Sequence, residues 1–429
     1  MSARQMKLGL FLWATGHHIA AWRHPDAHVT AGIDIGHYIQ LARTAEAAKF
    51  DMVFCEDAAG LREANVQIAS QTSRSIGFEP ISLLSALAIQ TERIGLVSTA
   101  STSYNEPYGL ARTFASLDNL SGGRAGWNLV TSASPIEAAN FGATGLRPHA
   151  DRYARAREFA TVVTGLWNRR AAGHDGESFS VRDPLDIPPS PQGAPVMVQA
   201  GASDDGKDLA ARTADVVFSA AQTFDEAKAF YGDLKGRLAA YGRQPDDVKI
   251  MPGVAPIVAA TKAEAQAKYD ALQEMIPDDV GVALLSSYLS ISDLGRYPID
   301  GPLPELPESE GMKSRQALVI EQARRDGLSI RELARYFAGA RGHWRVVGTA
   351  EQVADELQAR FEGGAADGFN VMPSWFPGEL DAFATLVVPE LQRRGLFRKD
   401  YEGRTLREHL GLKRPVKGFN PSAALCRTP

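Results

Sequence analysis

Short apolar runs that alternate with longer amphipathic stretches constrain the fold of this chain more than any other feature. Each run is nearly continuous in apolar residues, which is typical of strands buried on both faces of a parallel sheet. Eight such strands alternating with helices predict an α/β fold of the (β/α)8, or TIM-barrel, type. An open doubly wound sheet is the main alternative, but the chain lacks the strand–Gly-x-Gly-x-x-Gly–helix element typical of one. The expected strands are residues 7–12, 50–55, 93–98, 124–130, 195–199, 215–219, 249–258 and 368–372.

Amphipathic patterns predict the helices between these strands. Asp34 is placed to cap a helix over residues 35–49. Thr349 and Gln352 form a capping-box pattern that opens a helix over residues 351–361. Further helices are expected at residues 81–92, 151–167, 207–214 and 225–241.

Two connections are too long for plain barrel loops. Residues 132–194 separate the fourth strand from the fifth, and residues 259–367 separate the seventh from the eighth. Within the second insertion we expect a lid over residues 277–345, because the stretch 316–340 is helix-patterned; a disordered surface excursion is the alternative. The whole chain, 1–429, is then one barrel domain, whose C-terminal tail at 395–429 lies along the barrel or a partner subunit.

Composition excludes several classes of protein. The 46 basic and 51 acidic side chains give a net charge of −5 without a basic run, which argues against a general nucleic-acid binder. With only two cysteines, Cys55 and Cys426, a disulfide framework is excluded and a reducing compartment fits. No apolar run approaches ~18 residues and no signal-peptide pattern is present, so we expect a cytoplasmic protein without membrane contact.

In a barrel of this kind, functional residues collect where strands end and the following loops begin. The loop after the first strand, residues 13–25, contains His17, His18 and Trp22. A catalytic metal is not expected, because adjacent side chains on an extended segment point in opposite directions and the fifth and sixth strands contain no histidine. We interpret this loop as part of a substrate pocket, with ordinary surface packing as the alternative.

Polar residues follow or interrupt the next three strands. Asp57 follows the second strand and either serves a site or fixes its loop. Thr99 and Ser103 belong to the hydroxyl-rich end of the third strand, which either lines a polar cofactor or forms a Ser/Thr turn. Asn128 interrupts the apolar fourth strand, and it either satisfies its neighbours or binds a ligand at the barrel mouth.

The fifth strand runs into a glycine-containing segment, residues 199–206, directly before a helix. Free backbone N–H groups and the helix dipole favour an anion such as phosphate at such a start. Ser203 could instead be a simple N-cap, and the adjacent carboxylates of Asp204 and Asp205 would repel a phosphate unless they point away.

Several motifs occur in order along nearly the whole chain. Through these motifs the chain resembles the bacterial-luciferase-like, two-component flavin monooxygenases. Within that family it is most similar to the nitrilotriacetate and dibenzothiophene-sulfone monooxygenase branch. The motifs are Gly16 to Asp26, Thr99 to Tyr108, Leu120 to Ser132, His149 to Tyr153, Ala200 to Ser203, Ala340 to Thr349 and Val388 to Leu396.

The resemblance implies a (β/α)8 barrel that binds reduced FMN at the carboxyl ends of its strands. A separate NAD(P)H-dependent FMN reductase would supply the reduced flavin by diffusion, which agrees with the missing dinucleotide motif. Dioxygen would form a peroxyflavin that inserts one oxygen atom into a small organic substrate, as in xenobiotic degradation. A homodimer or homotetramer is expected.

The resemblance also assigns roles to individual residues. His17 is the candidate for orienting substrate or peroxide, and Asn128 for dioxygen activation near the flavin ring. Ser103 stands where relatives often have Thr, which keeps the hydroxyl. Trp22 and His343 are weaker candidates for substrate contact. The residues expected to bind the flavin are Asp57, Thr99, Ser103, Asn128, His149, Tyr153 and Ser203, the last three at its ribityl–phosphate end.

Two other functions fit a similar barrel. A deazaflavin-dependent hydride transferase should lack the Trp127-Asn128 strand and the His149-x-x-x-Tyr153 spacing. A non-catalytic flavin-binding relative tends to lose parts of the barrel, whereas all eight strands are expected here. The substrate stays open between an anion and an aromatic sulfur or halogenated compound. The residues that favour an anion are His17, Arg23, His24 and Arg341, and those that favour an aromatic compound are Trp13, Trp22 and Trp375.

Overall fold

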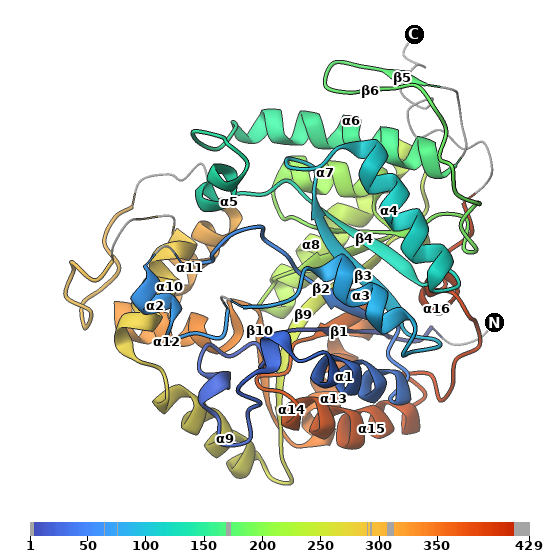
Figure 1. Ribbon diagram of the computed structural model, residues 1–429. Helices are drawn as coiled ribbons and strands as arrows, with labels where there is room; N and C mark the ends of the chain where they lie inside the picture. Colours follow the sequence, from blue (N-terminus) through green and yellow to red (C-terminus); the bar gives the residue numbers. More distant parts are fainter. Residues whose placement is uncertain are drawn as a thin grey trace.

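Eight parallel strands close into a barrel, which confirms the predicted fold (Figure 1). A computed structural model describes residues 4–63, 65–74, 76–168, 173–289, 291, 294–306 and 313–415. Each strand pairs with the next, and the last returns to the first with Gly368 beside Lys7. The barrel strands are β1 (Lys7–Phe11), β2 (Met52–Cys55), β3 (Gly95–Ser101), β4 (Ala125–Val130), β7 (Val196–Ala200), β8 (Val216–Ser219), β9 (Lys249–Val258) and β11 (Gly368–Val371).

The amino ends of the strands are closed by the C-terminal segment. Leu406 and Leu410 of helix α16 (Leu406–Leu410) join the cluster of apolar side chains that fills the barrel. Gly95 and Gly126 make room for them, because a Cβ atom on either would meet the Leu406 side chain. The described part of the tail therefore packs against the barrel of its own chain.

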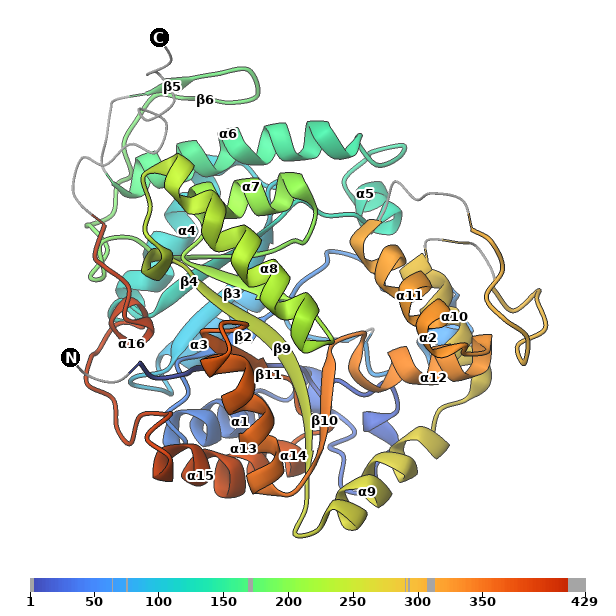
Figure 2. The ribbon, with the colours of Figure 1, turned by 180° about the vertical axis from the view of Figure 1, so that it is seen from behind.

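Helices surround the barrel (Figures 1 and 2), and α1, α3, α7, α8 and α13 lie where amphipathic patterns predicted helices, whereas α4, α14 and α15 were not predicted. Asp34 caps α1 by accepting hydrogen bonds from the N–H groups of Gly36 and His37, and Thr349 and Gln352 form the expected capping box. In the described part of the chain, no helix is long and apolar enough to cross a membrane. The surrounding helices include α1 (Ile35–Ala47), α3 (Pro80–Ala88), α4 (Pro107–Leu120), α7 (Asp204–Thr213), α8 (Phe224–Arg237), α13 (Ala350–Glu362), α14 (Gly378–Ala382) and α15 (Val388–Arg393).

The connection between β4 and β7 contains α5 (Pro135–Asn140), α6 (His149–Trp167) and a small hairpin of β5 (His174–Asp175) and β6 (Ser180–Val181). Helix α6 packs against α4 and α7, and its apolar face buries Phe159 against Trp127 of β4. This packing carries the first turn of α6 to the start of α7.

Within the connection between β9 and β11, side chains of three helices form a separate small core. We call the helical segment that contains this core the cap. Its helix-patterned stretch holds two helices rather than one, because the chain turns at Gly327, where φ is +62°. The cap is followed by a strand that the sequence did not indicate, β10 (Trp344–Gly348), which pairs with the second half of β9. In Figures 1 and 2 the cap and the short helix α2 (Val66–Ala69) lie at the opposite end of the molecule from α16. The cap helices are α9 (Lys262–Glu274), α10 (Asp278–Leu289), α11 (Lys313–Asp326) and α12 (Ile330–Ala340).

Candidate active site

A chain of hydrogen bonds joins β4, β3 and β2 at the carboxyl side of the barrel. Asn128 lies beside Thr99 in the sheet register, and its Nδ2 donates to Thr99 Oγ1 at 2.8 Å. Thr99 in turn donates its single hydroxyl proton to the carbonyl of Cys55 at 2.8 Å. The hydroxyl must therefore accept from Asn128, which fixes the amide orientation. Asn128 Oδ1 is left buried, with no hydrogen-bond partner among the described residues, so it can accept from a ligand.

The hydroxyl groups at the ends of β3 and β4 are held mainly by the protein itself. Ser103 Oγ donates to the carbonyl of Thr131 at 2.7 Å, and Ser132 Oγ donates to Ser101 Oγ at 2.7 Å. Ser132 adopts a positive φ of +50°, which turns the chain away from the strand. Ser103 can therefore still accept a hydrogen bond from a ligand, while its own proton is engaged.

His149, Tyr153 and Ser203 come together where the first turns of α6 and α7 meet. The rings of His149 and Tyr153 lie 4.7 Å apart. A Cβ atom on Gly206 would lie 3.2 Å from the Tyr153 hydroxyl, and one on Gly201 would lie 3.5 Å from it. The tyrosine hydroxyl thus lies over two glycines at the helix start, and we call this polar group of residues the cradle.

Ser203 is the N-cap of α7, and its Oγ accepts from the N–H of Gly206 at 3.1 Å. The adjacent Asp204 lies 2.8 Å from Arg237 and 3.3 Å from Lys207, so its charge is directed toward α8. Asp205 Oδ2 lies 3.3 Å from His149 Nδ1. Capping uses only the acceptor side of the Ser203 hydroxyl, so its proton stays available for an anion at the positive end of the helix.

An aromatic floor formed by Phe11, Phe54 and Phe218 lies at the carboxyl ends of β1, β2 and β8. Their ring centroids are 4.9 to 5.7 Å apart. His17 packs edge-on against Phe11 at 4.5 Å, and His343 packs against Phe218 at 5.0 Å. The floor therefore brings together two histidines that lie 326 positions apart in the sequence.

His17 is buried and neutral. Its Nε2 donates to the carbonyl of Phe11 at 2.9 Å, so Nδ1 carries the lone pair and finds no hydrogen-bond partner in the described part of the chain. Burial, together with the nearby Arg341 guanidinium, lowers the pKa of His17 to about 3. At neutral pH the side chain can accept a hydrogen bond from a ligand and cannot act as a general acid.

The other predicted residues of the first loop lie apart from this floor. Trp22 Nε1 donates to the carbonyl of Gln71 at 3.1 Å, and the guanidinium of Arg23 lies over its ring. His18 accepts from the N–H of Ala20 at 3.2 Å. Among the residues that the structure describes, no group of three or more His, Cys, Asp or Glu side chains is placed to hold a metal ion.

The two acidic residues after β2 have different environments. The carboxyl group of Asp57 is solvent-accessible, yet desolvation by the surrounding protein, reinforced by the charges of Glu79 and Glu137, raises its pKa to about 6. Burial opposes ionisation of Glu56, but Arg341 at 2.7 Å and Arg62 at 2.8 Å hold its pKa well below the usual range.

Arg62, Arg74 and Glu56 are the main residues of this region that were not selected from the sequence. Arg62 and Arg74 lie in the long loop after β2. A loop that follows a barrel strand commonly contributes to the active site, so this position could have indicated them. The guanidinium groups of Arg62 and Arg341 both lie over the ring of Trp13, at 4.7 and 5.1 Å. This stacking holds both guanidinium groups beside Glu56.

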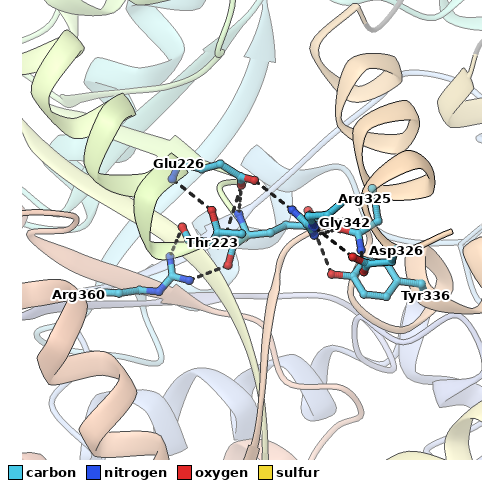
Figure 3. A network of polar contacts seen from close by, with 9 residues as sticks. Thr223, Glu226, Arg325, Asp326, Tyr336, Gly342 and Arg360 are labelled. Atoms are coloured by element: carbon cyan, nitrogen blue, oxygen red, sulfur yellow. Dashed lines mark hydrogen bonds and ion pairs between the residues drawn. The ribbon is translucent and has the colours of Figure 1, made fainter. Parts of the chain in front are cut away.

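A network of polar contacts ties the cap to the loop after β8 (Figure 3). Tyr336 donates to Gln222 Oε1 at 3.0 Å, and Gln222 Nε2 donates to the carbonyl of Gly342 at 3.2 Å. Arg325 of α11 lies 3.5 Å from Glu226 of α8. Because these residues come from both sides of the cap boundary, they hold the cap over the carboxyl side of the barrel.

Comparisons with known proteins agree with this geometry. A family model described as luciferase-like monooxygenase matches residues 11–367. Nitrilotriacetate monooxygenase component A of Aminobacter aminovorans is 47% identical, over 96% of this chain and 97% of the relative. N-acetyl-S-(2-succino)cysteine monooxygenase of Bacillus subtilis is 47% identical, over 97% and 98% of the two chains. Dibenzothiophene-sulfone monooxygenase of Rhodococcus erythropolis is 38% identical, over 98% and 99%.

Solved structures are similar over the same length. An EDTA monooxygenase from Chelativorans sp. BNC1 has a TM-score of 0.82 at 32% identity and covers 97% of this chain and all of its own. A riboflavin lyase, solved with modified FMN and riboflavin, has a TM-score of 0.87 at 30% identity and covers 98% of this chain and 99% of its own. An F420-dependent secondary alcohol dehydrogenase is 14% identical with a TM-score of 0.61, which is a likeness of fold.

Proposed function

Since this chain belongs to the luciferase-like monooxygenase family, we propose that it is the oxygenase of a two-component system. A separate NAD(P)H-dependent FMN reductase would deliver reduced FMN, and the oxygenase would insert one atom of dioxygen into a small organic substrate. The name "component A" of the nitrilotriacetate relative supports a second component, and the modified FMN in the riboflavin lyase supports a flavin.

The observation that carries this proposal is the fit of a phosphorylated, planar cofactor to two features of the site. The cradle below Tyr153, with Ser203 and His149 at its edge, suits a phosphate, because it offers a hydroxyl proton, an imidazole and a helix start without Cβ atoms at Gly201 and Gly206. The unsatisfied Oδ1 of Asn128 suits a donor on the cofactor.

The residues that would hold FMN divide accordingly. His149, Tyr153 and Ser203 would bind its phosphate end, while Thr99 and Asn128 would face its ring. Ser103 and Asp57 would complete this polar side. When bound, reduced FMN would supply the electrons with which dioxygen is activated.

The chain itself would orient the substrate and keep water out. The aromatic floor and the cap give the carboxyl side of the barrel a partly apolar enclosure, in which hydrogen bonds are stronger than in water. His17 would accept a hydrogen bond from substrate or an oxygen species through Nδ1, because its low pKa keeps that nitrogen unprotonated. His343 and Trp22 would contact the substrate from other sides.

Anaerobic titration with reduced FMN, followed by admission of dioxygen, tests the proposal. We expect tighter binding of reduced than of oxidised FMN, since reduced flavin must be captured from solution, and dioxygen consumption only with reduced FMN. A parallel titration with reduced deazaflavin tests the hydride-transferase alternative. Turnover with deazaflavin and none with FMN would contradict the proposed function.

A further inference from the structure

A narrow cavity lies between the loop after β2 and helix α10 of the cap. Its volume is about 40 Å³, above the roughly 10–15 Å³ that a cavity needs to hold one water, so it has room for a small polar group of a larger ligand. Its walls combine apolar and charged side chains. The apolar ones include Ile19, Ile68 and Leu284, and the charged ones are Arg62, Glu63 and Arg74.

The charges around this cavity do not balance. Arg62 shares Glu56 with Arg341, and Glu63 accepts a hydrogen bond from the N–H of Asn65 at 2.8 Å. Arg74 makes no ion pair with any carboxylate of the described residues, and its guanidinium donates to the carbonyl of His17 at 3.3 Å. The cavity is thus lined by two arginines and one glutamate, and the arginine without an ion pair is Arg74.

The partly buried charge of Arg74 has no ion-pair partner among the described residues. Arg74 is partly exposed, and desolvation by the surrounding protein, together with the nearby Arg341 charge, lowers its pKa to about 10. Buried charges in proteins are ordinarily paired or bind a ligand. The planar fork of an arginine is suited to a carboxylate, which it can bind through two parallel hydrogen bonds.

We propose that Arg74, with Arg62, binds a carboxylate group of the substrate, so that the substrate of this enzyme is a carboxylate-bearing compound. The inference rests on the proposed oxygenase function and deepens it. Arg74 is hydrogen-bonded to His17, and His17 packs on the aromatic floor. The carboxylate would therefore lie in the cavity beside α10, while the rest of the substrate extends over the floor toward Asn128.

Acids and their methyl esters, which lack the negative charge and carry one added methyl group at each carboxyl, test the proposal without turnover. Thiodiglycolate and iminodiacetate carry two carboxylates, and their dimethyl esters carry none. We expect the two acids, but not the esters, to raise the melting temperature of the wild-type protein in a concentration-dependent way. Arg74→Gln should raise the apparent Kd of the acids about tenfold or more, and Arg74→Lys less, because a charge is retained.

Two further variants keep the result interpretable. Arg43→Gln, on α1 and bonded to Gln90, removes an arginine outside this cavity and should leave acid binding unchanged. If Arg74→Gln does not fold, Arg62→Gln is measured in its place, with the same expected loss. Equal binding of acids and esters, or unchanged acid binding in a folded Arg74→Gln or Arg62→Gln protein, would overturn the proposal.

Reduced-FMN binding separates this inference from the proposed function. A wild-type protein that binds reduced FMN but discriminates no acid from its ester contradicts the carboxylate site alone. A wild-type protein that fails to bind reduced FMN contradicts the oxygenase function instead. In both Arg74 variants the affinity for reduced FMN should stay within about twofold of wild type, since a hydrogen bond contributes more than that and Arg74 is not among the residues assigned to the flavin.

Discussion

Replacing Asn128 with alanine should uncouple the reaction while leaving the barrel folded. The change removes the hydrogen bond to Thr99, which costs about 0.5–1.5 kcal/mol. It also removes the buried Oδ1, which has no hydrogen-bond partner among the described residues and whose desolvation costs about 1–3 kcal/mol. Because these contributions oppose each other and Thr99 still donates to Cys55, we expect the free energy of unfolding to change by no more than about 2 kcal/mol.

The effect on the reaction should be larger. Nδ2 of Asn128 has a second proton for which the described residues provide no hydrogen-bond acceptor, and a hydrogen bond to a charged group contributes about 1.5–3 kcal/mol. Since 1.36 kcal/mol corresponds to a tenfold change in rate, the ratio of product to hydrogen peroxide should fall about ten- to a hundredfold. Thr99→Val, which keeps the amide but removes the group that orients it, should lower the ratio to a smaller extent.

The assay combines three measurements on the same preparation: melting temperature, affinity for reduced FMN, and the ratio of product to peroxide. Asn119→Ala is the control, because Asn119 donates only to backbone carbonyls around the outer helix α4. Normal coupling in a well-folded Asn128→Ala protein would remove Asn128 from the mechanism. A large loss of stability together with weak flavin binding would show instead that Asn128 serves only the fold.

Three further predictions address the flavin site, the partner and the charge of Asp57. Ser203→Ala and Tyr153→Phe should each weaken binding of reduced FMN by ~1 kcal/mol or more. The control Tyr108→Phe, on the outer helix α4, should leave binding unchanged. Unchanged titrations in both site variants would refute the phosphate site. The purified chain should not oxidise NADH until a flavin reductase and FMN are added, and robust oxidation by the chain alone would exclude the two-component scheme. The raised pKa of Asp57 means that the contribution of this residue to the free energy of unfolding falls as pH rises from about 4 to about 6. Asp57→Asn should therefore raise the melting temperature at pH 8 but not at pH 3.5. Equal shifts at both pH values would contradict this assignment.

The barrel could be predicted because burial leaves a local trace in the sequence. Runs such as Lys7–Phe11 and Gly95–Ser101 are nearly continuous in apolar or small residues, and strands enclosed on both faces require this. The pairing of Asn128 with Thr99 follows from the register of two neighbouring strands. Both residues lie on strands that the apolar runs predicted, and the carboxyl ends of parallel strands lie at the same end of a barrel.

Other features depend on contacts between distant segments and leave no such trace. The countercharges of Glu56 come from a loop after β2 and from Arg341 at the end of α12, 285 positions away. Strand β10, Trp344–Gly348, pairs with β9 and lies outside the closed barrel, and its buried positions alternate with partly exposed ones. Its sequence therefore lacks the continuous apolar run that marks the barrel strands. The closure of the barrel by Leu406 depends on Gly95 and Gly126, whose importance appears only when the three residues are brought together.

The transfer of one oxygen atom from dioxygen to the substrate is the central claim, and isotope labelling measures it directly. The reaction is run with reduced FMN supplied by a flavin reductase, a compound that the protein oxygenates, and ¹⁸O₂ in unlabelled water. The account predicts one ¹⁸O atom in the oxygenated product, unless it exchanges with water, and a lower yield of this labelled product in Asn128→Ala. Product oxygen that comes from water, demonstrated by the reciprocal experiment in H₂¹⁸O with non-exchanging product, would contradict it.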